Sequence, residues 1–219
     1  MSLQLHGYWR SSASYRVRIA LHLKQLAFDY IPVHLVKGGG QQKAEPYTRI
    51  NPSMLVPTFI DDDEDVVLNQ SMAILEYLDD KYPDSPQLLP SHSLDKARVR
   101  ALAQDVACDI QPITNLRILE TLKSDFNASA EDVKAWNQKW ITTGFDALEK
   151  RLQTRSGQYS YGYDVTLADV CLIPQVYNAI RFEVDMSVYP LISKIWENCN
   201  KLDAFKKAAP ENQVDAIRS

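Results

Sequence analysis

Three serines stand between a predicted strand and a predicted helix. Ser11, Ser12 and Ser14 come after the apolar alternation of residues 3–7 and before the helical spacing of residues 17–24. The first turn of a helix presents unpaired N–H groups and a partial positive charge, so a hydroxyl placed there can donate a hydrogen bond to a bound anion. Hydroxyls at this position also cap helices, and the local pattern alone favours capping.

Three other features of the N-terminal third have chemistry that could hold a ligand. Ser71 lies at the predicted start of a helix and suits a carboxylate, although an N-cap is the simpler interpretation. Val56-Pro57 precedes a strand, where the sequence alone favours an ordinary trans proline. Gln42 follows three glycines, and a solvated loop position is what its surroundings favour.

Two arginines are candidates for binding carboxylates, because a guanidinium pairs with a carboxylate through two hydrogen bonds. Arg10 precedes the serines, and Arg181 lies late in a predicted helix between Ile180 and Phe182. A basic residue near a helix C-terminus also interacts favourably with the helix dipole, which is the structural alternative for Arg181. Arg117 is a weaker candidate, for which a solvated helix face is the simpler interpretation.

Two pairs of polar residues have helical spacing. Gln111 and Asn115 are four residues apart and are expected to share one face of a helix that Pro112 bends. Spacing alone leaves open whether that face borders a site or solvent. Thr166 and Asp169 fit a capping box, which we assign to folding.

The elements that must position these residues divide the chain into two parts. Residues 1–83 show strand, helix, strand, then two strands joined by an acidic turn and a final helix, the βαβ-ββα order of a thioredoxin-like domain. Residues 84–93 are rich in proline and serine and are predicted to be a linker. Residues 94–219 are predicted to form an all-helical domain, with helices over residues 95–123, 130–153, 167–181 and 191–208. The polar residues 210–219 are expected to be frayed.

Composition argues against several classes of protein. The 219 residues are 45% apolar and 24% charged, and their net charge of −4 disfavours nonspecific binding of nucleic acid. No apolar run approaches the roughly 18 residues that a membrane span needs, and the N-terminus lacks a signal-peptide pattern, so we expect a cytoplasmic protein. Three dispersed cysteines and four histidines without ligand spacing predict neither a disulfide scaffold nor a metal site.

Residues 11–20, Ser-Ser-Ala-Ser-Tyr-Arg-Val-Arg-Ile-Ala, resemble the Ser-Ser-Cys-Ser-x-Arg-Val-Arg-Ile-Ala signature of the zeta-class glutathione transferases, which include maleylacetoacetate isomerases. The resemblance spans nearly the whole chain and implies the two-domain glutathione transferase architecture. It continues in residues 39–42, 51–52, 56–58, 70–71, 110–115, 166–169 and 174–182. Ala13 stands where the family has a cysteine; because the serines remain, we expect the glutathione thiolate to be stabilised without that thiol.

The resemblance implies that glutathione is the cofactor and that a small dicarboxylate is the substrate. Ser11, Ser12 and Arg10 become the catalytic candidates, with Ser11 favoured as the hydrogen-bond donor to the thiolate. Arg10 and Arg181 become the substrate-binding candidates. A homodimer in the cytoplasm is implied as well.

The family also implies how glutathione is held. A cis Val56-Pro57 bond would turn the Val56 backbone outward, to pair with the cysteinyl backbone of glutathione. Ser71 would meet the γ-glutamyl carboxylate and Gln42 the glycyl carboxylate. The expected glutathione contacts are Ser11, Ser12, Ala13, Ser14, Tyr15, Arg16, Gln42, Val56, Pro57, Gln70, Ser71, Gln111, Asn115, Leu116 and Arg117.

The reaction implied by the resemblance is a cis–trans isomerisation of maleylacetoacetate, late in tyrosine and phenylalanine catabolism. The thiolate would add reversibly to the double bond, the resulting single bond would rotate, and glutathione would leave. A maleylpyruvate isomerase is the nearest alternative. A transferase that conjugates or dehalogenates small electrophiles is another, and Ala13 favours a fourth, a non-catalytic glutathione-binding protein.

Overall fold

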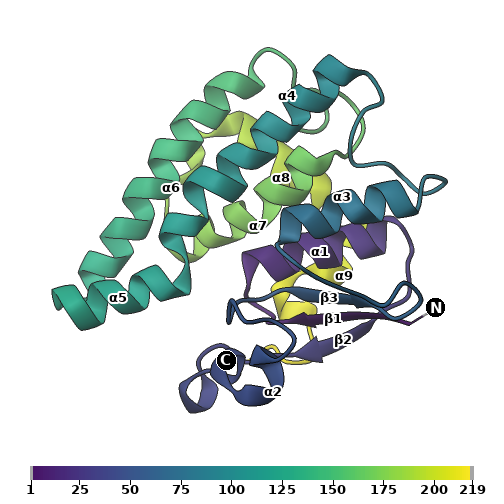
Figure 1. The fold of residues 1–219 in the computed structure, drawn as a ribbon. Helices are drawn as coiled ribbons and strands as arrows, with labels where there is room; N and C mark the ends of the chain where they lie inside the picture. Colours follow the sequence, from purple (N-terminus) through teal and green to yellow (C-terminus); the bar gives the residue numbers. More distant parts are fainter. Residues whose placement is uncertain (1, 218–219) are drawn as a thin grey trace. The chain divides into compact units, whose positions relative to one another are not determined.

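The computed structural model describes residues 2–217 and divides them into two compact units (Figure 1). The first unit contains residues 2–88 and 201–217, and the second contains residues 89–200. The predicted linker, residues 84–93, contains the boundary. The helical unit is shorter than the predicted range of residues 94–219, because helix α9 (Asp203–Ala208) packs against α1 (Ser12–Leu23) in the first unit.

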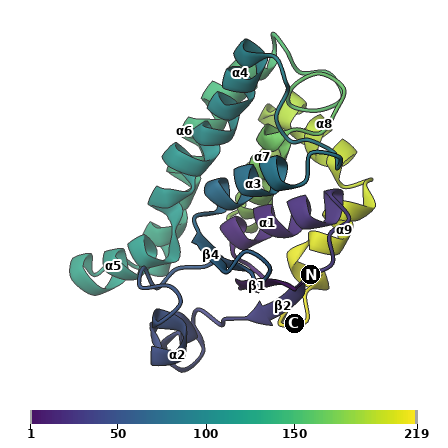
Figure 2. The ribbon, with the colours of Figure 1, turned by 45° about the vertical axis from the view of Figure 1, so that its right-hand side comes forward.

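Four strands form one sheet in the order β2-β1-β3-β4. β1 (Leu3–Gly7) pairs in parallel with β2 (Asp29–Pro32) and antiparallel with β3 (Thr58–Asp61), which pairs antiparallel with β4 (Val66–Asn69). α1 connects β1 to β2, and α3 (Ser71–Lys81) follows β4. The two helices pack together over the sheet (Figures 1 and 2). The predicted βαβ-ββα order is confirmed, and it places the N-terminal ends of α1 and α3 just after strands.

The segment between β2 and β3 is irregular but well tethered. It contains 3₁₀ turns and the one-turn helix α2, at Lys37–Gly39, Gln41–Lys43 and Glu45–Thr48. The Leu55 carbonyl accepts hydrogen bonds from the Tyr47 hydroxyl (2.5 Å) and from Asn51 Nδ2 (2.8 Å), and Asn51 Nδ2 also donates to Thr58 Oγ1 (3.0 Å). These bonds fix the chain immediately before β3.

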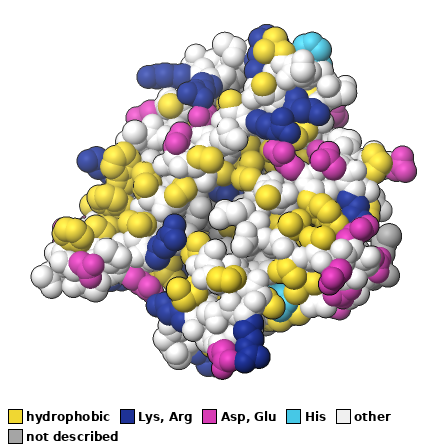
Figure 3. Space-filling model, viewed as in Figure 1, with side chains coloured by type: hydrophobic (Ala, Val, Ile, Leu, Met, Phe, Trp, Pro, Cys, Tyr) yellow, Lys and Arg dark blue, Asp and Glu magenta, His cyan; other side chains and the backbone are white. Residues whose placement is uncertain are grey.

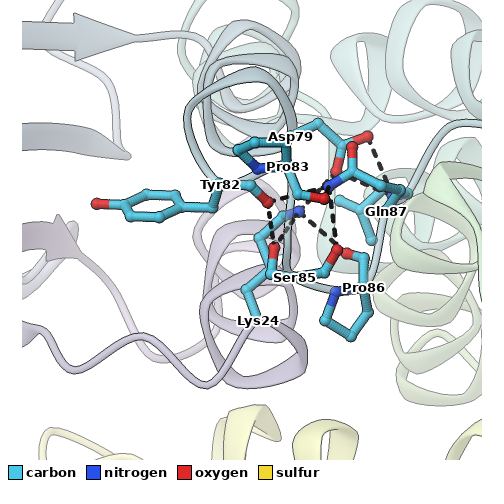
Figure 4. Close-up of polar contacts among 8 residues, drawn as sticks. Lys24, Asp79, Tyr82, Pro83, Ser85, Pro86 and Gln87 are labelled. Carbon is cyan, nitrogen blue, oxygen red and sulfur yellow. Dashed lines mark hydrogen bonds and ion pairs between the residues drawn. The ribbon is translucent and has the colours of Figure 1, made fainter.

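A buried ion pair between α1 and α3 holds residues 85–88 against the helices of the first unit (Figure 4). The Lys24 ammonium, at the C-terminal end of α1, lies 2.8 Å from Asp79 Oδ1 of α3. It also donates to Ser85 Oγ and to the Pro86 carbonyl, both at 3.0 Å. The Leu88 N–H donates to both Asp79 oxygens, at 2.9 and 3.0 Å. Both charges are buried, and each has a charged partner and further hydrogen bonds, so the path of residues 85–88 is defined.

The second unit is built from helices, with no strand among residues 89–200. They are α4 (Ser93–Gln104), α5 (Leu116–Phe126), α6 (Ala130–Leu152), α7 (Leu167–Arg181) and α8 (Pro190–Cys199), with 3₁₀ turns at Pro112–Thr114 and Met186–Val188. The predicted capping box is confirmed: Asp169 Oδ2 accepts the Thr166 N–H at 2.8 Å and its hydroxyl at 3.0 Å. α7 begins and ends at the predicted residues, 167 and 181.

The prediction of one bent helix over residues 95–123 is wrong. α4 ends at Gln104 and continues as a π-helical segment, Asp105–Ile110, followed by the 3₁₀ turn Pro112–Thr114. Asn115 then has an extended backbone and caps α5. Pro112 lacks an N–H and cannot continue the helical hydrogen-bond pattern, so the chain restarts instead of bending. The predicted helix over residues 191–208 is likewise divided between α8 and α9.

The expectation of fraying at residues 210–219 is wrong for residues 210–217. Pro210–Asn212 forms a 3₁₀ turn, and Asp215 Oδ2 accepts a hydrogen bond from the Trp9 N–H at 3.0 Å. Residues 218 and 219 lie outside the described residues. The polar composition of the segment gave no sign of these contacts, because polar groups and not an apolar stripe make them.

Three further properties concern residues 2–217. No helix in that range is both long enough and apolar enough to cross a membrane. No three His, Cys, Asp or Glu side chains are grouped there as metal ligands. The three cysteines are free thiols, of which Cys171 and Cys199 are buried and Cys108 is exposed.

The buried pair predicts a large effect of one substitution. Lys24→Met should lower the free energy of unfolding by about 3–5 kcal/mol, because Asp79 would stay buried without its ammonium partner. Urea unfolding measures the change. Adding Asp79→Leu should recover part of the loss. The control is Lys37→Met at an exposed lysine, expected within about 0.5 kcal/mol of wild type; an equal loss in both single variants would contradict this account.

Candidate active site

Ser11 is the N-cap of α1. Its Oγ accepts a hydrogen bond from the Ser14 N–H at 3.2 Å, and its side chain is half-buried. Capping uses one lone pair and leaves the hydroxyl hydrogen, which has no acceptor among the described residues. The two interpretations of Ser11 are therefore compatible: it caps the helix, and it can donate to an anion at the positive end of α1.

The next serines of α1 are less accessible. Ser14 is fully buried, and its Oγ accepts the Tyr8 N–H at 3.4 Å. Ser12 is buried, at 8% exposure, whereas Ala13 is half-buried. Tyr15 is buried in the first unit. Ser11 is thus the least buried hydroxyl of the three, which agrees with its selection as the thiolate donor.

The start of α3 lies beside α1. Arg16 Nη1 donates to Ser71 Oγ at 3.2 Å, and both side chains are buried. The preceding Gln70 is exposed and has a φ of +69° with ψ of 107°, a backbone conformation that costs a non-glycine residue about 1–3 kcal/mol. The contact links two helix N-termini, each suited to an anion, and the strained Gln70 marks the α3 end as a candidate site.

The Val56-Pro57 bond is cis, which confirms the expectation drawn from the family and overturns the one drawn from the sequence alone. The β3 ladder starts at Thr58, so Val56 lies outside it. Neither the N–H nor the carbonyl of Val56 makes a hydrogen bond within residues 2–217. This half-buried peptide group is available to pair with an extended ligand backbone, as in the addition of a short strand.

Gln42 is buried, so the interpretation of a solvated glutamine is wrong. Its Nε2 donates to the Leu35 carbonyl at 3.2 Å, and its Oε1 is buried without a partner among the described residues. A carboxylate ligand would have to use the second hydrogen on Nε2.

Arg10 is half-buried and lies over the Trp9 ring, with its guanidinium carbon 5.1 Å from the ring centroid. It forms no ion pair with any residue in the range 2–217. A cation held by an aromatic face, with its charge uncompensated, fits the predicted role of binding an anionic substrate group.

The candidates in the helical unit sit on separate elements. Gln111 is half-buried at the end of the π-helical segment, and its N–H donates to the Val106 carbonyl at 2.9 Å. Asn115 is the N-cap of α5, and its Oδ1 accepts the Arg117 N–H at 3.2 Å. Because a 3₁₀ turn and an extended residue separate them, the expectation that Gln111 and Asn115 share one helix face is wrong.

The other candidates of the helical unit lie at the start of α5 and at the end of α7. Leu116 is half-buried and Arg117 is exposed, in the first turn of α5. Arg181 is exposed at the last residue of α7, with its guanidinium carbon 4.6 Å from the Phe182 ring centroid. Its position at the helix C-terminus agrees with both interpretations made from the sequence.

Residues of α6 contact the irregular segment, residues 105–114, that contains Gln111. Arg151 pairs with Asp105 at 2.6 Å, and Trp136 Nε1 donates to the Ile113 carbonyl at 2.8 Å. Between these contacts, a Cβ at Gly144 would lie 2.2 Å from Ile110 Cδ1, so only glycine leaves room for Ile110 there. Burial raises the pKa of Asp105, and the Arg151 charge opposes that rise. The three contacts span the segment from its first residue to the 3₁₀ turn.

Sequence analysis missed the residues that fix residues 8–11, called here the serine turn. The Ser11 N–H closes this turn by donating to the Tyr8 carbonyl at 3.0 Å. Arg18, fully buried in α1, donates to the Trp9 carbonyl at 2.9 Å, and Asp215 accepts the Trp9 N–H. An arginine between apolar neighbours in α1 was a signal for a buried role, whereas nothing local indicated Asp215.

Comparisons with known proteins agree with the architecture described above. Residues 5–86 match the family model described as Glutathione S-transferase, N-terminal domain. The chain is 50% identical to a probable maleylacetoacetate isomerase of Vibrio cholerae over 99% of both chains. It is 45% identical to the holo structure of maleyl pyruvate isomerase, described as a bacterial zeta-class glutathione transferase, with a TM-score of 0.93 over 98% of this chain and 100% of that chain.

A further solved structure is informative about ligands. Maleylacetoacetate isomerase from Anaeromyxobacter dehalogenans, with bound dicarboxyethyl glutathione and citrate in its active site, is 38% identical, with a TM-score of 0.86. The match covers 99% of this chain and 98% of that chain.

The contact at Gly144 gives a prediction that opposes helix propensity. Alanine in place of an interior helical glycine normally stabilises a helix by about 1 kcal/mol. Gly144→Ala should instead destabilise the protein by about 1–3 kcal/mol, because its methyl group would collide with Ile110. Thermal and urea unfolding measure this, and adding Ile110→Val should restore part of the stability. A Gly144→Ala variant that is more stable than wild type would show that the contact does not constrain the segment.

Proposed function

Because the chain belongs to the zeta-class glutathione transferases, we propose that it is a glutathione-dependent cis–trans isomerase of a maleyl-type dicarboxylate, with maleylacetoacetate as the preferred substrate. One observation carries the proposal: the Ser11 hydroxyl, at the N-terminus of α1, caps the helix and still has its hydrogen to donate. Bound glutathione would supply a thiolate that adds reversibly to the double bond and so permits rotation.

Ser11 and the start of α1 have the task of keeping that sulfur ionised. A free thiol of the cysteine type has a pKa of about 8.5, and each unit of lowering requires about 1.4 kcal/mol. A hydrogen bond to a charged group contributes about 1.5–3 kcal/mol and a helix N-terminus about 0.3–1 kcal/mol. Together these lower the thiol pKa by about one to three units, which is enough to make the thiolate abundant near neutral pH. Ala13 contributes no thiol, and none is needed, because glutathione supplies the sulfur while Ser11 and the start of α1 stabilise it.

The remaining residues of the first unit would hold the tripeptide. We assign the Val56 backbone to the cysteinyl backbone of glutathione, because the ladder of β3 leaves that peptide group unused. Ser71 and the start of α3 would take the γ-glutamyl carboxylate. Gln42 is our candidate for the glycyl carboxylate, through its second Nε2 hydrogen.

Carboxylates of the substrate would be neutralised by Arg10 and Arg181. Arg10 has no internal ion pair within residues 2–217 to give up, which supports its assignment. Gln111, Asn115, Leu116 and Arg117 are proposed to contact glutathione from the helical unit. The dicarboxyethyl glutathione in the Anaeromyxobacter enzyme supports this chemistry, because it joins glutathione to a group with two carboxylates.

Maleylpyruvate isomerisation is the second candidate function. The 45% identity and the TM-score of 0.93 to the maleyl pyruvate isomerase structure favour it, and the same residues would serve a shorter substrate. We further propose a cytoplasmic homodimer, placed in tyrosine and phenylalanine catabolism if maleylacetoacetate is the substrate. Figure 3 shows hydrophobic side chains gathered on the left of the face that it draws, over α5 and the adjoining end of α6, and such a surface is suited to contact with another protein. Phe126, the last residue of α5, is 72% exposed.

The direct test is an ultraviolet assay of both isomerisations, with and without glutathione. We expect turnover that requires glutathione and a clear preference for one of the two substrates. Absence of turnover with both, despite tight binding of glutathione, would contradict the proposal and favour a conjugating transferase or a non-catalytic binder.

Substitution of Ser11 should separate capping from thiolate stabilisation. Ser11→Gly costs a helix cap only a few tenths of a kcal/mol but removes the donor. It should raise the pKa of the bound glutathione thiol by about one unit and lower kcat/KM at neutral pH about tenfold or more. The control is Ser129→Ala, which removes the N-cap serine of α6 and should reduce stability while leaving the thiol pKa unchanged. An unchanged thiol pKa in Ser11→Gly would remove Ser11 from the mechanism.

Substitution of Arg10 should affect the substrate and not the cofactor. Arg10→Gln is expected to raise KM for the dicarboxylate about tenfold or more, because a charge-assisted pair with a carboxylate is lost. The dissociation constant of glutathione, measured by calorimetry, should stay within about twofold of wild type. Arg49→Gln, at an exposed arginine paired with Glu45, is the matched control and should change neither value. A KM equal to that of wild type would exclude Arg10 from substrate binding.

A further inference from the structure

The C-terminal segment of the chain contacts the serine turn directly. After α9, which packs against α1, the chain returns along the first unit toward β1 and β2 (Figure 2). Asp215 then accepts the Trp9 N–H through Oδ2, at 3.0 Å, across more than two hundred residues of sequence. Trp9 lies two residues before Ser11. The C-terminal segment therefore contacts the serine turn, which contains Ser11, the residue proposed to stabilise the thiolate.

Asp215 acts together with a buried arginine. Arg18 Nη2 donates to the Trp9 carbonyl at 2.9 Å, and Arg18 Nη1 donates to the Tyr8 carbonyl at 3.4 Å. Arg18 Nε donates to the Ala208 carbonyl, at the end of α9, at 2.9 Å. Both the N–H and the carbonyl of Trp9 are thus occupied, one by Asp215 and one by Arg18. The N–H and the carbonyl of Trp9 have fixed orientations, because each is held by a partner from another element.

The position of the Ser11 hydroxyl depends on those orientations. Ser11 is joined to the turn through its own N–H, which donates to the Tyr8 carbonyl. Hydrogen bonds weaken steeply once the donor–hydrogen–acceptor angle falls below about 120°, so the alignment of the Ser11 hydroxyl decides how well it stabilises a bound anion. A displacement of the turn by a fraction of an ångström would therefore reduce the stabilisation of a thiolate at Ser11.

We propose that Asp215 is a positioning residue for the proposed isomerase: it holds the Trp9 peptide so that Ser11 presents its hydroxyl to the glutathione sulfur. The inference rests on the proposed function of Ser11. It assigns a role in the site to α9 and the segment that follows it, through the Ala208 carbonyl, the Asp215 carboxylate and the packing of α9 against α1.

Charge and position have opposite effects, which makes the proposal testable. Removing a negative charge near a thiol lowers its pKa, because the thiolate is then less repelled. Losing the position of the Ser11 donor raises the thiol pKa. Asp215→Asn removes the charge but keeps a side-chain oxygen for the Trp9 N–H, whereas Asp215→Ala removes both. The two variants therefore separate the two causes.

The experiment combines a measurement on the free protein with one on the complex. Without glutathione, hydrogen exchange at the Trp9 amide should be about tenfold faster or more in Asp215→Ala and near wild type in Asp215→Asn. With glutathione, an ultraviolet titration of the thiolate should give a pKa raised by about half a unit or more in Asp215→Ala, and not raised in Asp215→Asn. Glu211→Ala, at an exposed carboxylate of the same segment, is the control and should change neither quantity.

Two results would overturn the inference. One is a thiol pKa in Asp215→Ala equal to or below that of wild type, and the other is unchanged exchange at the Trp9 amide. Failure of the proposed function would look different, because the wild-type complex itself would then show a thiol pKa no lower than that of free glutathione. Thermal unfolding of each variant, with the conservative Asp215→Asn as reference, shows whether the fold has been kept.

Discussion

The buried guanidinium of Arg18 is the constraint on which the first unit depends. Its Nε, Nη1 and Nη2 atoms donate to carbonyls of Ala208, Tyr8 and Trp9, so one side chain joins α1, the serine turn and the end of α9. Burial lowers the pKa of Arg18 from its usual high value, and the negative charge of Asp215 is among the influences that oppose this. A buried cation is tolerated only when its donors are satisfied, and here satisfying them fixes the loop that carries the candidate chemistry.

The candidate site relies on backbone groups more than on reactive side chains. Two helix N-termini, those of α1 and α3, are joined by the hydrogen bond from Arg16 to Ser71, and the Val56 peptide supplies a free edge. Such a site needs accurately placed N–H groups and one hydroxyl. It does not need a thiol of its own, since glutathione brings one. This explains physically why alanine is compatible with the proposed activity at position 13, where the family signature has cysteine.

Much of the first unit could be predicted from the sequence, and the helical unit only in part. The strands, α1, α3 and the capping box at Thr166 have local signals, which are alternation, helical periodicity and a polar pair at fixed spacing. The cis bond at Pro57 followed from the family, since no local feature distinguishes it from a trans bond. The change to a π-helical segment after Gln104 was missed because residues 95–123 keep helical periodicity. Ile110, in that segment, packs against Gly144 of a different helix, and such a contact leaves no local signal in the sequence. Asp215 was missed because its contact joins residues that are distant in sequence.

The central claim is that glutathione acts as a reusable thiolate and is not consumed. The most direct measurement follows maleylacetoacetate and maleylpyruvate with a fixed, small amount of glutathione, and quantifies both product and free glutathione at the end. The account predicts many equivalents of trans product for each equivalent of glutathione, with the glutathione recovered unchanged. Product limited to one equivalent, or glutathione recovered as a stable thioether, would contradict isomerisation and identify a conjugating transferase.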